Sequence, residues 1–165
     1  MEPLIKDLET ILEKELLLHM QLLDAARTMN KAIKMEDLAK VKESGKIYDE
    51  LTCQIETMEE KRLIINDALA HSLGIQNHPN LLRIINKLPD NRKAKLSKLR
   101  TDLKSTIEEL KRTNSSNQIL LTESLRTIAK VFEFIDGARI KLSGYKHQGK
   151  KASVLINRTI INTIA

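Results

Sequence analysis

The stretch spanning residues 91–142 constrains the fold more than any other part of this 165-residue chain. Its apolar residues recur at intervals of three and four, which places side chains on one face of a helix. They are Leu96, Leu99, Leu103, Ile107 and Leu110, followed after a polar gap by Leu121, Leu125, Ile128, Phe132 and Ile135. The pattern predicts a long amphipathic helix of about 50 residues, roughly 75 Å in length.

The polar gap at residues 113–117 decides between one helix and two. Its five residues are poor helix formers, each costing roughly 0.5 kcal/mol relative to Ala, so a turn is the alternative. Asn114 and Asn117, however, fall on the seam positions between Leu110 and Leu121. A turn between separate helices has no reason to keep that register, so we predict a continuous helix.

The two asparagines have two interpretations. On a covered coiled-coil seam, Asn114 and Asn117 form polar layers that fix helix register and reduce stability. Where no partner helix covers the seam, they face water. The sequence leaves both interpretations open.

Composition favours long helices packed side by side over a thick core. The chain has two Tyr, two Phe and no Trp, and its five Gly and three Pro leave few turn signals for strands. We predict an all-α single domain over residues 1–165, an elongated antiparallel helical bundle that contains a coiled-coil hairpin. Residues 1–75 form an acidic helical hairpin, 76–142 a short helix plus the long basic third helix, and 143–165 a connector and a C-terminal helical tail.

The hairpin has recognisable ends. Pro3 suits the first turn of a helix, polar residues between Asn30 and Leu38 indicate a tight connection rather than a long loop, and Gly74 suits a left-handed cap after the second helix. A short helical segment follows Asn80, and Asp90 is expected to cap the long helix after Pro89.

Four hairpin residues interrupt the apolar pattern. Arg62 takes a seam position and is expected to extend its guanidinium outward to water. His19 is read as a hydrogen-bonded or half-exposed packing residue, and Cys53 as a small buried or half-buried hydrophobe. Gly45 indicates a close helix approach or a slight kink.

Charge is distributed unevenly. Residues 1–75 carry 15 Asp/Glu and 10 Lys/Arg, whereas residues 76–165 carry 7 and 18. Either the two halves attract each other, or the basic half meets an acidic partner or nucleic acid. The basic run at 92–100 lies at the positive end of its helix dipole, which suggests compensation by the acidic hairpin.

No catalytic, metal-binding or cofactor-binding site is expected, because no phosphate loop, nucleophile motif or metal-ligand spacing is present. The N-terminus lacks a positive leader before an apolar segment, and no apolar run is long enough to span a membrane. We therefore expect a cytoplasmic protein without stable membrane insertion.

The apolar tail after Lys151 is expected to become ordered only in an apolar groove, because burial of its side chains roughly balances the entropy of ordering them. That groove lies either on its own bundle or on a partner. The apolar tail residues are Val154, Leu155, Ile156, Ile160, Ile161 and Ile164.

The chain resembles the FlgN family of flagellar export chaperones over nearly its whole length. The resemblance rests on the acidic hairpin and on the run Asn114, Asn117, Leu120, Leu121, Ser124 and Leu125, followed by Tyr145 and Gly149 and a hydrophobic tail. It implies a non-enzymatic cytoplasmic chaperone of the flagellar type III system. Such a protein holds hook-associated proteins, prevents their premature assembly and delivers them to the export gate and its ATPase complex.

The resemblance also implies roles for residues near the C-terminus. The tail residues Val154 to Ile164 are candidates for cargo binding, and Tyr145 is a candidate for contact with the export gate. The alternative function is a basic coiled-coil adaptor or nucleic-acid-associated protein that uses residues 92–112, although no nucleic acid is expected as a partner. Monomer and homodimer both remain open.

Overall fold

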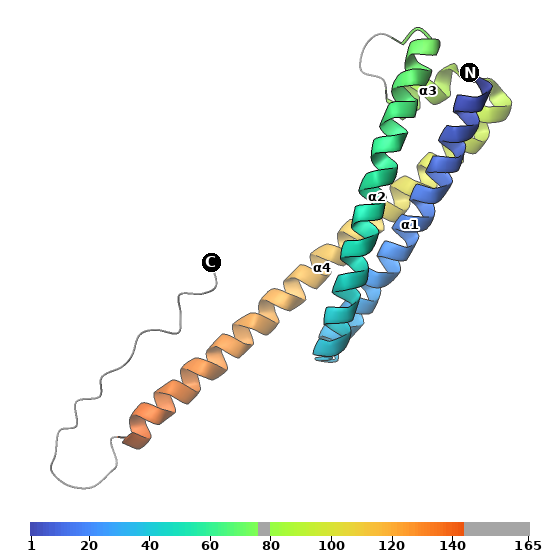
Figure 1. Cartoon of the computed structure of the whole chain (residues 1–165). Helices are drawn as coiled ribbons and strands as arrows, with labels where there is room; N and C mark the ends of the chain where they lie inside the picture. The colour runs from blue at the N-terminus through green and yellow to red at the C-terminus, as the bar shows by residue number, and fades with distance from the viewer. Residues whose placement is uncertain (76–79, 144–165) are drawn as a thin grey trace. The chain divides into compact units, whose positions relative to one another are not determined.

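The computed structural model describes residues 1–75 and 80–143, with side chains described as far as Asp136. These residues form four helices, α1 (Glu2–Lys34), α2 (Leu38–Ser72), α3 (Leu81–Lys87) and α4 (Asp90–Ser143) (Figure 1). No strand occurs within the described ranges, which confirms the all-α class. The chain divides into two compact units, residues 1–125 and 126–165.

The first unit contains the antiparallel α1–α2 hairpin, whose helices lie side by side (Figure 1). The connection between them is tight, as predicted, and α1 continues through Asn30 to Lys34 before it. Ala32 and Ile33 are buried, and their packing holds this last turn in the helix. Asp37 then caps α2 by accepting a hydrogen bond from the Lys40 backbone N–H at 3.1 Å.

The turn between α2 and α3 agrees with the prediction from the sequence, whereas the start of α4 differs by one residue. Gly74 has a φ of 67°, which confirms the left-handed cap, and the Ile75 N–H donates to the Ala70 carbonyl at 2.9 Å as in a Schellman ending. Asn80 caps α3 through its side chain. Asp90 is the first residue inside α4 instead of its cap, because the Pro89 carbonyl accepts the first helical hydrogen bonds.

Two apolar clusters form the core of the first unit. One joins α1, α2, α3 and the start of α4, and its fully covered residues are Leu8, Leu12, Leu69, Ile84, Ile85 and Leu96. The other joins α1, α2 and α4 farther along, through Leu22, Leu23, Ala26, Leu51, Ile55 and Leu110. The part of α4 before residue 118 thus packs on the hairpin as a third helix, in agreement with the predicted helical bundle.

α4 passes through residues 113–117 without a break, which confirms the continuous helix.

The prediction for Cys53 is wrong, because its side chain is exposed. Two residues advance a helix by about 200°, so a residue midway between the buried Leu51 and Ile55 points to the opposite side. Every helix within the described ranges is too short or too polar to cross a lipid bilayer.

Candidate partner-binding surface

The asparagine positions of α4 are linked to the hairpin by hydrogen bonds. Asn117 is 4 % exposed, donates to the Ala26 carbonyl at 2.9 Å and accepts from the Asn30 side chain at 2.7 Å. The half-buried Asn114 donates to the Tyr48 hydroxyl at 2.6 Å. These contacts form a polar layer across the three helices near the α1–α2 connection.

Beyond this polar layer, the apolar side chains at the end of the first unit are uncovered. Ile119, Leu121 and Leu125 are 65 %, 38 % and 67 % exposed. A helix with an uncovered apolar face normally gains stability by packing that face against another surface. These residues are candidates for contact with a partner.

In the second unit, the helical residues 126–136 also expose apolar side chains at helical spacing. They are Ile128, Val131, Phe132 and Ile135, with Phe134 exposed beside them. Exposed Phe is uncommon on a soluble helix, and Phe132 is 63 % exposed. The predicted cargo-binding residues Val154, Leu155, Ile156, Ile160, Ile161 and Ile164, together with Tyr145, lie outside the described residues.

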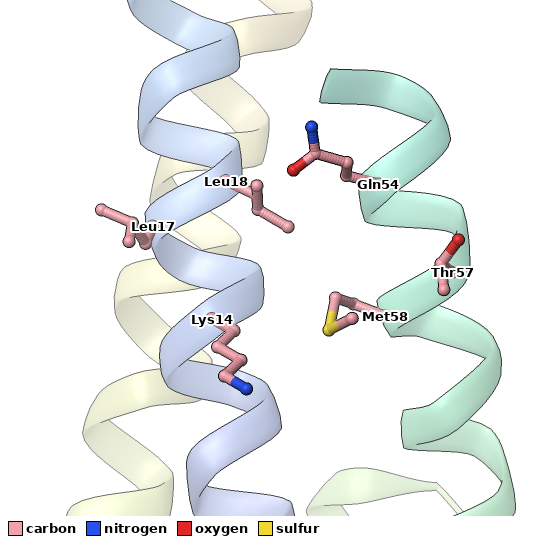
Figure 2. Close-up of a pocket in the computed structure, with 6 residues that line it drawn as sticks. All are labelled: Lys14, Leu17, Leu18, Gln54, Thr57 and Met58. Atoms are coloured by element: carbon pink, nitrogen blue, oxygen red, sulfur yellow. The ribbon is translucent and has the colours of Figure 1, made fainter. Parts of the chain in front are cut away.

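A shallow hollow of about 300 Å³ opens between the middle of α1 and the middle of α2 (Figure 2). Leu18 from α1 and Gln54 and Met58 from α2 point toward the space between the helices, whereas Leu17 points away from α2. The lining offers mainly apolar contact and no converging acid, base or nucleophile. This geometry suits packing of another side chain better than catalysis.

A buried ion pair lies at the same level of the bundle, between the two apolar clusters. Glu15 is buried, and its carboxylate accepts a hydrogen bond from Arg62 Nε at 2.9 Å, while Arg62 also contacts Glu59. Burial raises the pKa of Glu15 above its usual value, and the Arg62 charge opposes that shift. The prediction that Arg62 extends outward is therefore wrong, because the buried carboxylate attracts its guanidinium.

Two other hairpin residues that interrupt the apolar pattern, His19 and Gly45, have only local structural roles. The half-buried His19 ring hydrogen-bonds the Glu15 carbonyl at 2.8 Å, which confirms its packing role. Gly45 marks no close approach, since an added Cβ would meet only Met29 Cε at 3.9 Å. Within the described part of the chain, no group of three or more His, Cys, Asp or Glu could hold a metal ion.

The basic run at the start of α4 is compensated by α1. Lys95 Nζ lies 3.1 Å from Glu9 and 2.8 Å from Glu13, and Arg92 contacts Glu9 and Glu2. Hydrogen bonds to Glu13 and Glu9 raise the pKa of Lys95. The attraction between the acidic hairpin and the basic helix is thus confirmed for Arg92 and Lys95, which leaves these two cations less available to nucleic acid.

Sequence patterns identified some of these residues and missed their partners. The seam register singled out Asn114 and Asn117, but it did not identify Tyr48 and Asn30 as their partners, because these contacts cross between helices. The unbroken register placed the asparagines on the same face as the buried leucines, but it did not show whether a neighbouring helix covers them.

Comparison with known proteins gives a family for the chain. A family model described as FlgN protein matches residues 1–153. Neither the curated proteins nor the solved structures include a match to the chain.

Proposed function

Because this chain belongs to the FlgN family of flagellar export chaperones, we propose that it binds hook-associated proteins in the cytoplasm, prevents their premature assembly and delivers them to the type III export gate. FlgN is a chaperone family and not an enzyme family. The observation that carries the proposal is the family match over residues 1–153. The exposed apolar side chains of α4 support it, since a chaperone needs such a surface for an aggregation-prone segment.

We assign cargo binding to the tail residues Val154, Leu155, Ile156, Ile160, Ile161 and Ile164, and export-gate contact to Tyr145. An amphipathic helix of the cargo would lay its apolar side against these tail residues. Apolar contact of this kind persists in salt, whereas binding through phosphates weakens steeply as salt rises. Salt dependence therefore separates the chaperone from a nucleic-acid-associated protein.

The test is co-purification of the tagged chain from a flagellated host, followed by identification of the bound proteins. We expect hook-associated proteins to be retained at high salt and lost when the chain is truncated at Lys151. Substitution of Ile160 and Ile161 by Ser should weaken capture, whereas the matched control with Ser at Asn157 and Thr159 should not. Full-strength capture by the truncated chain would show that the tail residues do not bind the cargo.

The gate contact needs a separate measurement. Tyr145→Ala should leave hook-associated proteins bound while their secretion falls, because only the delivery step is affected. Loss of binding and secretion together would instead place Tyr145 in the cargo site.

A further inference from the structure

A second surface lies in the first unit, in a groove between the C-terminal part of α1 and α4. The groove has a volume of about 530 Å³. Four cations line it, three from α1 and one from α4, together with the polar side chains Asn30 and Ser116. The cations are Arg27, Lys31, Lys34 and Arg112, and we call this surface the basic groove.

The basic groove lacks the charge balance found elsewhere between the same two helices. At the other end of α1, carboxylates such as Glu9 meet the cations of α4. In the basic groove the carboxylate is Glu109, and it is already bound by Arg27 at 2.5 Å. Within the described residues, Lys31, Lys34 and Arg112 form no ion pair. Three cations from two helices thus line one hollow without anionic partners.

The remainder of the chain has no acidic side chain to place there. Residues 76–79 and 144–165, which lie outside the described ranges, contain no Asp or Glu, and residues 144–165 contain Lys146, Lys150, Lys151 and Arg158. A basic segment would be repelled by the basic groove. Charge complementarity therefore favours an anionic occupant from another molecule.

An apolar surface adjoins the basic groove on α4. A second hollow shares Arg112 and Ser116 with the groove and is also lined by Lys111, Ile119 and Leu120. Ile119 is largely exposed, so cationic and apolar groups lie next to one another. Neither hollow contains an aromatic side chain on which a nucleic-acid base could stack.

From this combination we propose that the basic groove and the adjoining Ile119 and Leu120 bind an acidic amphipathic helix of a partner protein. Carboxylates on one face of that helix pair with Lys31, Lys34 and Arg112, and its apolar face covers Ile119 and Leu120. The site is separate from the tail, so it does not depend on the proposed cargo assignment.

The test uses the whole chain and a fluorescent helical peptide with Glu on one face and Leu on the other. The control peptide carries Gln in place of Glu. Anisotropy titrations should show the Glu peptide binding about ten-fold tighter or more, with the difference shrinking as salt rises. The triple variant Lys31→Gln, Lys34→Gln, Arg112→Gln should lose about ten-fold in affinity for the Glu peptide and little for the Gln peptide.

Two further variants keep the result interpretable. Lys42→Gln, Lys46→Gln, Lys61→Gln removes the same charge from exposed positions of α2 and should retain binding. Ile119→Ser should weaken both peptides, because it removes apolar contact. Circular dichroism checks that each variant keeps its helices, and the salt dependence of the unsubstituted chain gives an independent reading if the triple variant unfolds.

Four results would overturn the proposal. Equal affinity for the Glu and Gln peptides would show that charge does not contribute to binding. Equal losses of affinity in the triple and control variants would show that the peptide does not bind at the basic groove. Tighter, triple-variant-sensitive binding of an oligothymidine strand or of phosphatidylglycerol vesicles would assign the groove to nucleic acid or membrane instead. Concentration-dependent assembly abolished by the triple variant would identify a second copy as the occupant.

Discussion

At the scale of single residues, the Glu15–Arg62 pair shows how a polar residue is accommodated between two apolar clusters. The Glu15 side chain is 3 % exposed and that of Arg62 is 19 % exposed. Desolvation of two charges offsets most of their mutual attraction, so such a pair adds little net stability. Removing one partner is costly, however, because the other charge stays buried.

Arg62→Met is therefore expected to lower the free energy of unfolding by about 3 kcal/mol at neutral pH. Urea denaturation followed by circular dichroism measures the change. The exposed neighbour provides a control, since Lys61→Met should stay within about 0.5 kcal/mol. Adding Glu15→Leu to Arg62→Met should recover most of the loss, and failure to recover would mean that Arg62 acts through packing alone.

The same variant should respond to pH in a defined direction. Burial raises the pKa of Glu15 in the folded state, and Arg62 lowers it in part. With Arg62 absent, the folded chain holds the Glu15 proton at pH values where the unfolded chain has lost it. Stability therefore falls as pH rises past the ordinary Glu pKa, and the deficit of Arg62→Met should be smaller at about pH 5 than at about pH 8. A deficit independent of pH would contradict this.

Asn117 has a different role, because its hydrogen-bond partners, the Asn30 side chain and the Ala26 carbonyl, are both neutral. Asn117→Ala removes the bonds to the Ala26 carbonyl and from the Asn30 amide. We expect a loss of about 2 kcal/mol in unfolding free energy, since one buried and one partly buried hydrogen bond disappear together with some packing. Gln118→Ala, at an exposed position one residue away, should change stability little. If both variants unfold alike, the polar layer contributes no stability.

At the scale of helices, two glycines of similar appearance in the sequence have opposite roles. Gly45 lies inside α2 with room for a Cβ, whereas Gly74 has a φ of 67°. Gly45→Ala should stabilise the protein by about 1 kcal/mol through helix propensity, and Gly74→Ala should destabilise it by a similar amount through backbone strain. Thermal unfolding of the two variants should shift in opposite directions. A stabilising Gly74→Ala would mean that the α2 cap relaxes without strain.

Helix positions were predictable where periodicity or caps define them. The unbroken seam predicted α4 through residues 113–117, and Gly74 and Asn80 predicted the turn before α3. The end of α1 was not predictable, because Asn30 looks like a turn residue and its helical state depends on buried Ala32 and on Asn117. Arg62 was misread for the same reason: spacing reveals the face of a helix, but not which carboxylate lies on the neighbouring one.

At the scale of the whole molecule, apolar side chains are buried in one part of the sequence and exposed in a later part. Every buried residue within the described side chains lies between Ile5 and Asn117. Apolar side chains from Ile119 to Ile135 are largely exposed, although their seam pattern matches that of the buried part. Periodicity predicted which side chains share a face, whereas their exposure depends on whether a neighbouring helix is present, which periodicity does not report.

The first unit should consequently fold without the rest of the chain. A fragment of residues 1–125 retains both apolar clusters, the Glu15–Arg62 pair and the polar layer around Asn114 and Asn117. We expect it to unfold cooperatively by circular dichroism, as a small domain with its own core does. Loss of cooperative unfolding would mean that the two clusters are insufficient without residues 126–165.

The same fragment tests where the exposed apolar surface lies. An apolar dye should bind the whole chain more strongly than the fragment, because residues 126–136 expose Ile128, Val131, Phe132 and Ile135. In the whole chain, Ile128→Ser with Phe132→Ser should reduce dye binding and leave the unfolding of the first unit unchanged, since neither residue belongs to its clusters. Equal dye binding by the fragment and the whole chain would instead place the accessible apolar surface before residue 126, at Ile119, Leu121 and Leu125.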